Sequence, residues 1–443
     1  MKRLLSPLLC IAACVSSTWA GPIDSFLQDP NLWAMKQPDF IAAAGPLGYK
    51  WTSSLQDSAR VYRRGMTETG ATEGGTTQNA MSVFGLPFVE SIAHFEGDKL
   101  TEITVTLYDR GDMGDLPKDR YTMMLTNARD TISKALNTPF AVRGKDANNA
   151  VRADGFLWQT PAARYVLEYS FTRGLKPQDP AFRAEFIRLS IAPPTKTVSL
   201  LASAANMDRA KFSGMMHVKR DAVSGDVWLG DVPMVDQGQK GYCVLASTER
   251  VMRYYGSKVD ENELAEVANA SSERGTDFES MLGALKKLGA RLKVRVREVE
   301  HSDVQQFLKL MADYNREAKH EHAPELPNPG HLIDAAAIYS EMDVKVLREA
   351  RTRNKSDVNR FEREIERKVD EGVPLLWTVM LGKVPEKGIP QNAGGHMRLI
   401  IGYNQAKQEI LYTDSWGPGH ELKRMSIDDA WTMTTGAMII EPL

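Results

Sequence analysis

The residues of this sequence that are best placed to do chemistry lie around Cys243. Cys243 joins a glycine-bearing loop to residues 244–255, whose apolar side chains recur at helical spacing. The positive end of such a helix would favour thiolate over thiol. Gln237 precedes the cysteine by six residues, and its amide could join the backbone N–H of Cys243 as a two-donor hole for an oxyanion. These residue types at this spacing predict a nucleophile for acyl transfer.

A cysteine nucleophile also needs a base and a group that orients the base. His396 begins an apolar run that is typical of a buried strand, and residues 410–413 are typical of the next strand. Asp414 follows directly, so a hairpin between the two strands would bring its carboxylate level with the imidazole of His396. The sequence therefore predicts a triad of Cys243, His396 and Asp414.

The order and spacing of these motifs resemble the papain-like cysteine peptidases. The matching residues are Gln237, Gly241, Cys243, Ser247, His396 and Ser415-Trp416-Gly417. Asp414 stands where papain itself has an asparagine, and Gly275-Thr276-Asp277 leads into a Leu-rich helix, which makes the chain more similar to the bacterial C39-like branch. Lys240 and Val244 depart from papain, which has a disulfide cysteine and a tryptophan there, so substrate specificity is not carried over.

The resemblance covers residues 230–443 and implies a papain-like fold and hydrolysis of peptide bonds. In the expected mechanism His396 and Cys243 form an imidazolium–thiolate pair, Gln237 stabilises the oxyanion, and Asp414 orients His396. This mechanism needs no metal and no organic cofactor. Two alternatives stay open: a transglutaminase or amidase that uses the same triad, and a pseudo-peptidase that binds without catalysis.

The composition indicates a globular protein with more than one domain. The 443 residues are enough for two or three domains, and 42% hydrophobic with 25% charged residues is ordinary for a soluble chain. The formal net charge of −2 gives no reason to expect nucleic acid or an acidic membrane surface as a partner. The expected partner is a peptide or protein substrate.

Residues 1–20 have the features of a signal peptide. A basic start, Met1-Lys2-Arg3, precedes an apolar stretch, and Thr18-Trp19-Ala20 fits a cleavage site. No later run has the length of a membrane span, so we expect export to the periplasm or the extracellular space. An alternative is that Ile11-Ala12-Ala13-Cys14 is a lipoprotein box, which would leave a lipid anchor on Cys14.

Removal of residues 1–20 would also take away Cys10 and Cys14, which leaves Cys243 as the only thiol. Oxidising compartments favour paired cysteines, so an unpaired cysteine there needs an explanation. A buried core cysteine is the structural alternative, and the surrounding motifs favour the nucleophile.

The first half of the mature chain, residues 21–194, reads as a separate α+β domain of unknown role. It could be a propeptide, an inhibitory cover or a docking domain. The expected strands are residues 88–94, 101–108, 156–158, 164–171 and 185–191, and the expected helix is 119–136. This order predicts a small antiparallel sheet covered by a helix. Residues 195–229 are expected to be a linker.

The second half, residues 230–443, combines helices and strands around the predicted triad. The expected helices are residues 276–288, stopped by Gly289, residues 303–311, capped by Ser302, and a helix from Ser356 to Gly372. Residues 292–296 and 373–379 are expected strands, the latter beside the His396 strand. Residues 315–331 are charged and proline-bearing, which predicts a surface insertion. Its histidines, His320, His322 and His331, lack a compact ligand spacing, so no metal site is predicted. The overall fold class is therefore α+β, with a papain-like domain after a smaller α+β domain.

Overall fold

The computed structural model describes residues 22–29, 31–62, 81–143, 154–172, 181–194, 214–238, 241–257, 259–268, 278–300, 303–328, 333–389 and 394–443. Several predictions lie outside the described residues. These are the signal peptide with Cys10 and Cys14, residues 195–213 of the expected linker, Lys240, Gly275-Thr276-Asp277, Ser302 and His331.

The N-terminal domain is built on one antiparallel sheet. Its strands are β1 (Lys50–Trp51), β2 (Ser58–Tyr62), β5 (Glu90–Glu96), β6 (Lys99–Asp109), β7 (Ala141–Arg143), β8 (Asp154–Gln159), β9 (Arg164–Thr172) and β10 (Arg183–Ala192). They lie in the order β1-β2-β5-β6-β10-β9-β8-β7, and the short hairpin β3 (Ser82–Val83) and β4 (Leu86–Pro87) stands apart. The predicted antiparallel arrangement is confirmed, although the sheet is wider than the sequence pattern indicates.

The long helix of this domain covers the sheet, as predicted. The helices are α1 (Pro22–Leu27), α2 (Gln37–Ala44), α3 (Arg110–Met113) and α4 (Lys118–Leu136), with 3-10 turns η1 (Leu32–Ala34) and η2 (Gly45–Leu47). Helix α4 buries Tyr121, Ala128 and Ile132 at helical spacing. The hydroxyl of Tyr121 donates to the backbone oxygens of Ser170 (2.8 Å) and Phe186 (3.0 Å), which attaches the helix to β9 and β10.

The C-terminal domain is a second antiparallel sheet surrounded by helices. Its strands are β11 (Val218–Arg220), β12 (Val227–Leu229), β13 (Val294–Glu300), β14 (Leu375–Leu381), β15 (Gly394–Asn404), β16 (Glu409–Thr413), β17 (Lys423–Ser426) and β18 (Thr434–Pro442). The main order is β11-β12-β15-β14-β18-β13, and β16 pairs with both β15 and β17. The predicted pairing of residues 373–379 beside the His396 strand is confirmed, because Val379 of β14 lies opposite His396 of β15.

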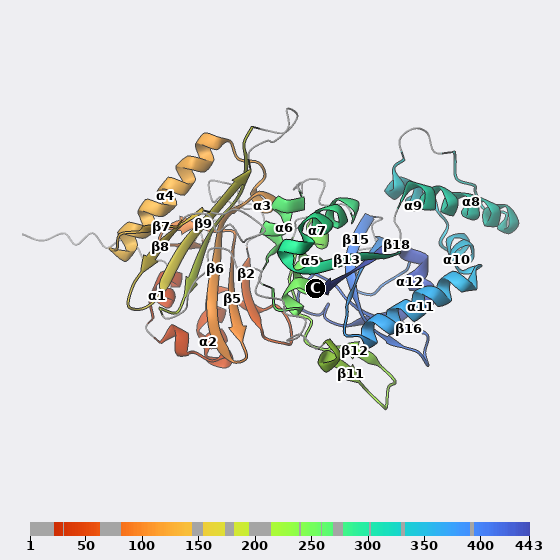
Figure 1. The fold of residues 1–443 in the computed structure, drawn as a ribbon, viewed down its shortest axis with the longest axis horizontal. Helices are drawn as coiled ribbons and strands as arrows, with labels where there is room; N and C mark the ends of the chain where they lie inside the picture. Colours follow the sequence, from red (N-terminus) through yellow and green to blue (C-terminus); the bar gives the residue numbers. More distant parts are fainter. Residues whose placement is uncertain are drawn as a thin grey trace, which may run out of the picture.

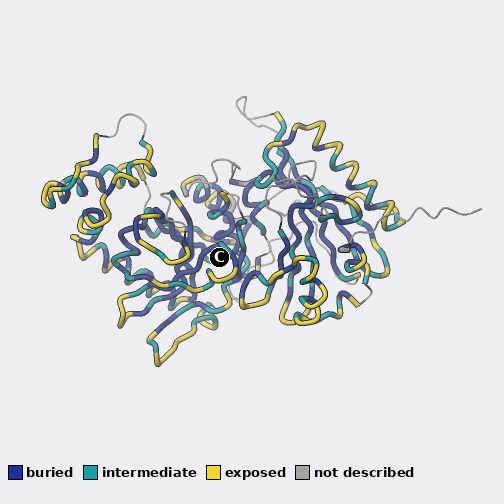
Figure 2. The backbone as a smooth tube through the Cα atoms, turned by 180° about the vertical axis from the view of Figure 1, so that it is seen from behind, coloured by how far each residue is buried: buried dark blue, intermediate teal, exposed yellow. Residues whose placement is uncertain are grey.

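Eight helices of the described chain belong to the C-terminal domain. They are α5 (Cys243–Tyr254), α6 (Glu261–Ala268), α7 (Phe278–Leu292), α8 (Val304–Glu321), α9 (Ala335–Glu341), α10 (Val344–Thr352), α11 (Lys355–Asp370) and α12 (Ile427–Met433); η3 (Gly214–His217) is a 3-10 turn. Figure 1 places α8, α9 and α10 at the end of the molecule farthest from the N-terminal domain. The outward sides of these helices are exposed, whereas the strands of both sheets are largely buried (Figure 2). Among the described residues, no helix combines the length and the apolar character needed to cross a bilayer.

Two helix ends differ from the prediction for identifiable reasons. Helix α7 runs through Gly289 to Leu292. A Cβ atom at Gly289 would lie 2.7 Å from the backbone oxygen of Val294, so this glycine allows the helix and β13 to approach closely and does not stop the helix. Helix α11 begins at Lys355, one residue before the expected Ser356, because the side chain of Asn354 caps it.

The expected surface insertion at residues 315–331 is partly helix. Helix α8 continues to Glu321 and ends where His322 adopts the left-handed conformation, with φ of 56°. Tyr314 and Ala318 are buried on its inner face and continue the spacing set by Leu310. Lys319 and His320 are exposed on the outer side, whereas Glu317 is buried beside Ala318, and this mixture of charged residues concealed the apolar periodicity.

The described part of the expected linker also differs from the prediction. Residues 218–220 and 227–229 form β11 and β12, and β12 pairs with β15 through Val227↔Tyr403 and Trp228↔Gly402. Because β12 pairs with a strand far along the chain, the local sequence carries no pattern that predicts this pairing. The Ser-Gly and Gly-Asp pairs of this segment therefore indicated a linker. These residues are part of the C-terminal sheet.

The two domains contact each other at the start of α5. Tyr242 is buried and lies against Gly111 of the N-terminal domain, where an added Cβ would come within 2.6 Å of its ring. Arg60 of β2 reaches across to Asp236, with Nη1 2.9 Å from Oδ2. The N-terminal domain therefore packs directly behind the helix that carries Cys243.

Candidate active site

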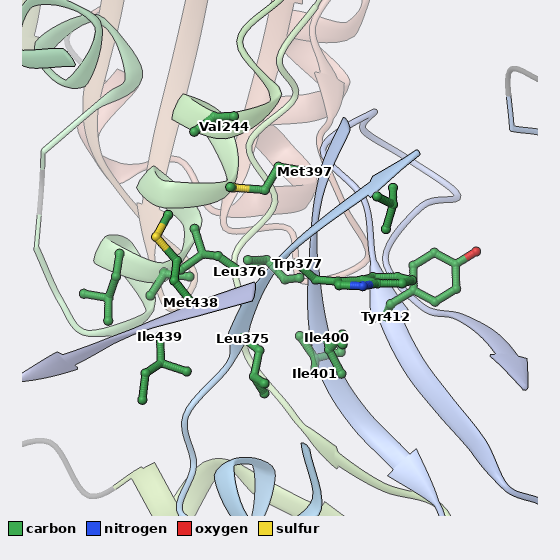
Figure 3. Close-up of a cluster of buried hydrophobic side chains, with 14 of the residues drawn as sticks. Val244, Leu375, Leu376, Trp377, Met397, Ile400, Ile401, Tyr412, Met438 and Ile439 are labelled. Carbon is green, nitrogen blue, oxygen red and sulfur yellow. The ribbon is translucent and has the colours of Figure 1, made fainter. Parts of the chain in front are cut away.

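Helix α5 places Cys243 beside the first residues of β15. Cys243 is the first residue of the helix and is half-buried. One turn further on, the hydroxyl of Ser247 donates to the backbone oxygen of Met397 at 3.2 Å. Val244 and Met397 belong to the same buried cluster, drawn in Figure 3. Because Met397 follows His396, this packing brings the thiol and the imidazole to the same point.

His396 and Asp414 form a buried pair, as the hairpin of β15 and β16 predicts. Nε2 of His396 lies 2.6 Å from Oδ1 of Asp414. Since Nε2 is occupied, Nδ1 is the ring nitrogen left for Cys243. Burial by itself lowers the pKa of His396, but the charge of Asp414 and hydrogen bonds to Asp414 and Cys243 outweigh it and raise the pKa to about 9. The protonated imidazole is thus the favoured form near neutral pH.

Trp416 covers the ring of His396. The two rings are stacked, with centroids 4.3 Å apart and an interplanar angle of 11°. The indole therefore shields the imidazole and its bond to Asp414 from water and restricts rotation of the ring. Trp416 of the segment Ser415-Trp416-Gly417 thus covers one face of the imidazole.

His396 is not the only group that binds the carboxylate of Asp414. Its Oδ2 accepts from Nε of Arg398 at 2.9 Å, and its Oδ1 accepts from the backbone N–H of Ser415 at 2.9 Å. Burial raises the pKa of Asp414, but His396 and Arg398 lower it by more, so the carboxylate stays ionised. The buried Arg250 binds the backbone oxygen of Asp414 at 2.8 Å and thereby fixes the end of β16 relative to α5.

Sequence reasoning missed Arg398, which links the candidate site to a second carboxylate. Arg398 is fully buried, and its Nη1 and Nη2 donate to the two oxygens of Glu386 at 2.8 and 2.9 Å. The hydroxyl of Tyr412 also donates to Glu386. The available signal was the presence of arginine two residues after His396 in an otherwise apolar strand, because such a position is buried and demands a carboxylate partner.

Gln237 is attached to the residue that follows Asp414. The backbone N–H of Gln237 donates to the backbone oxygen of Ser415 at 2.9 Å, and Oγ of Ser415 donates to Oε1 of Gln237 at 2.7 Å. Since Oε1 accepts this bond, the amide nitrogen is the end of Gln237 directed away from Ser415. An amide held in this way suits a donor to an oxyanion, and that role stays a prediction.

A groove of about 1230 Å³ opens at Cys243 and His396. It continues between the central sheet and helices α8 and α10, and Thr378, Thr434 and Trp431 line its inner wall. The thiol of Cys243 is therefore accessible from a groove that is large enough to hold several residues of an extended peptide. Cys243 and His396 of the predicted triad lie at one part of this groove, and the fully buried Asp414 binds His396 from within the protein. The half-buried thiol with an imidazolium beside it can act as a nucleophile.

The comparison with protein families concerns this same half of the chain. Residues 229–439 match the Peptidase_C39 like family, and this segment contains the predicted nucleophile, histidine, aspartate and glutamine. A search of curated proteins found no match to the chain. The C-terminal half is therefore similar to the C39-like peptidases over residues 229–439, which confirms the resemblance carried by its motifs.

Proposed function

We propose that this chain is an exported cysteine peptidase that hydrolyses peptide bonds in a papain-like domain. The observation that carries the proposal is the imidazole of His396, held between Asp414 and Trp416 and hydrogen-bonded to Cys243. The similarity to the C39-like peptidases supports the same class of reaction.

In the proposed reaction the thiolate of Cys243 attacks the carbonyl carbon of the scissile peptide bond. The amide of Gln237 and the backbone N–H of Cys243 stabilise the oxyanion of the tetrahedral intermediate. His396 then gives its proton to the leaving amine, and the C–N bond breaks to leave a thioester on Cys243. His396 next takes a proton from water, whose oxygen attacks the thioester, and the acid product leaves as the thiolate is restored.

The test is the rate at which iodoacetamide alkylates Cys243 between pH 5 and pH 10, measured on the mature protein. An ion pair with His396 predicts fast labelling that persists well below pH 7 and is lost in His396→Ala. Slow labelling that rises only near an ordinary thiol pKa of about 8.5 would overturn the proposal. Internally quenched peptides then report cleavage, which Cys243→Ala must abolish. If a labelled primary amine, in place of water, takes the acyl group, the protein is a transferase.

Export is the second part of the proposal and rests on residues 1–20. Expression in a bacterium, followed by fractionation and mass determination of the N-terminus, tests it. A periplasmic or secreted protein that begins at Gly21 is the expected result. A lipidated Cys14 would replace signal cleavage after Ala20 with a lipid anchor, and an uncleaved cytoplasmic protein would contradict export.

A further inference from the structure

The charges that line the groove are mostly neutralised within it. Three arginines of the groove pair with groove carboxylates: Arg360 with Glu300, Arg353 with Glu317, and Arg316 with Asp313. A paired arginine has little charge left to attract a ligand. Cations without a carboxylate partner are therefore the ones to consider as binding groups.

Arg351, on α10, is such a cation. Its Nε and Nη2 donate to the backbone oxygen of Trp431 at 3.0 and 2.8 Å, and Nη2 also donates to that of Thr434 at 2.9 Å. The guanidinium lies over the ring of Trp431, 4.2 Å from its centroid. Among the described residues, Arg351 forms no ion pair, and Nη1 has no hydrogen-bond partner. The carbonyls fix the plane of the guanidinium and leave one edge available to the groove.

The surroundings make this charge receptive to an anion. Burial is the largest influence on the pKa of Arg351 and lowers it. The negative charges of nearby Tyr339 and Glu300 raise this pKa by less, so the net shift is downward. Lys309 also lines the groove without a carboxylate partner among the described residues, but it is exposed, so water and salt screen its charge. Arg351 is thus the stronger binding group for a carboxylate.

The register of the sheet relates the backbone that Arg351 binds to the strand that carries His396. His396 lies opposite Val379, and Val379 lies opposite Thr434, whose backbone oxygen Arg351 binds. Two strand spacings separate the backbones of His396 and Thr434, which is on the order of 10 Å. An extended peptide advances about 3.3 Å per residue, so roughly three residues cover this distance.

We propose that Arg351 is a specificity-determining residue that binds a carboxylate of the substrate about three residues from the scissile bond. The inference rests on the proposed peptidase function and names the class of substrate: a peptide with an acidic side chain, or a free C-terminal carboxylate, at that position. The peptide residues between this position and the scissile bond would lie along the wall formed by Thr378, Trp431 and Thr434.

The experiment uses bromoacetyl peptides, which alkylate Cys243 without turnover. The peptides carry Glu or Gln at the first, second or third residue after the bromoacetyl group, each with an amidated C-terminus. A further set of Gln peptides ends at the first, second or third residue with a free C-terminus, so that the C-terminal carboxylate replaces the acidic side chain at that position. We expect the wild-type mature protein to react about tenfold faster with an acidic peptide than with its amide counterpart, with the preference greatest near the third position. The amidated Glu and free-acid Gln peptides distinguish the two sources of the carboxylate.

Variants assign the preference to one residue. Arg351→Gln is expected to bring the ratio of acidic to amide rates to about one, whereas Lys309→Gln keeps it near tenfold. Arg351→Lys retains the charge but loses the planar fork, so it is expected to keep a preference of a few-fold. Iodoacetamide labelling of each variant checks that the thiol and His396 are intact.

The outcomes separate the inference from the function on which it rests. Fast iodoacetamide labelling at low pH with equal bromoacetyl rates for acidic and amide peptides in the wild type overturns the role of Arg351 and leaves the peptidase proposal standing. Slow labelling by every reagent overturns both. Loss of the preference in Lys309→Gln, but not in Arg351→Gln, would assign the site to the wrong cation and also contradicts the inference.

Discussion

Nε2 of His396 lies 2.6 Å from Oδ1 of Asp414, and the two side chains are almost completely buried. The other carboxylate oxygen of Asp414 is occupied by Arg398, so Asp414 holds two cations at once. This arrangement fixes the orientation of the imidazole ring of His396 and directs its remaining nitrogen to Cys243. It also makes the histidine more basic than a free imidazole, which has consequences for stability and for activity.

The first prediction concerns pH. The pKa of His396 is raised from 6.5 to about 9, so the folded state holds a proton that the unfolded chain releases in this interval. The resulting stabilisation, about 3 kcal/mol at most, is fully present below pH 6.5 and is lost as the pH rises through about 9. Urea unfolding at pH 6, 7.5 and 9.5 measures it. The difference in unfolding free energy between wild type and His396→Gln should shrink as the pH rises, and a constant difference would contradict the raised pKa.

The raised pKa of His396 also predicts the pH above which activity falls. Turnover needs the imidazolium to protonate the leaving amine, so kcat/KM should fall above about pH 9, whereas alkylation of the thiolate should persist there. A fall that begins near pH 6.5 would indicate that Asp414 does not raise the basicity of His396.

The second prediction concerns the oxyanion hole. Gln237→Ala should lower kcat by about a hundredfold or more with little change in KM, because the donor acts mainly in the transition state. Ser415→Ala frees Oε1 of Gln237 from its 2.7 Å bond, so it should lower kcat in the same direction by a smaller factor. Steady-state kinetics on one peptide substrate measures both. If Gln237→Ala raises KM and leaves kcat unchanged, Gln237 binds the ground state and does not stabilise the oxyanion.

The third prediction concerns Arg398. Arg398→Met leaves Asp414 and Glu386 without their shared buried cation, so it should destabilise the protein by about 3–5 kcal/mol. Arg367→Gln is the matched control, because Arg367 is exposed and its pairs with Glu364 and Glu371 lie on the surface, where such pairs contribute below about 1 kcal/mol. Urea denaturation of both variants gives the comparison. Similar losses in the two would show that the Arg398 pairs stabilise no more than surface pairs.

The fourth prediction concerns the contact between the domains. A methyl group in Gly111→Ala would meet the ring of Tyr242 at 2.6 Å, and Tyr242 precedes the nucleophile. We expect a loss of about 1–3 kcal/mol and slower alkylation of Cys243. Gly283→Ala in α7 is the control, since nothing lies within 4 Å of its added Cβ, and it should leave the labelling rate unchanged. Equal labelling rates in wild type and Gly111→Ala would show that the N-terminal domain does not influence the position of Cys243.

The local features of the candidate site could be predicted from the amino-acid sequence. The apolar spacing after Cys243 predicts its helix, and the hairpin of the His396 strand predicts the position of Asp414, because both depend on neighbours within a few residues or one turn. The amphipathic face of α11 and the helix over the N-terminal sheet could be predicted for the same reason.

Contacts between residues far apart in the chain could not be predicted from the sequence and are known from the fold alone. The pairing of β12 with β15, the place of Arg398 between Asp414 and Glu386, and the position of Arg351 beside Thr434 join residues far apart in the chain, and no local pattern encodes such pairs. Gly289 illustrates the same limit. The local sequence indicates that this glycine ends a helix, whereas in the fold it allows α7 to lie close to β13. Local periodicity is set by the backbone geometry of each segment, whereas these contacts are set by how the segments pack, and packing is a property of the whole fold.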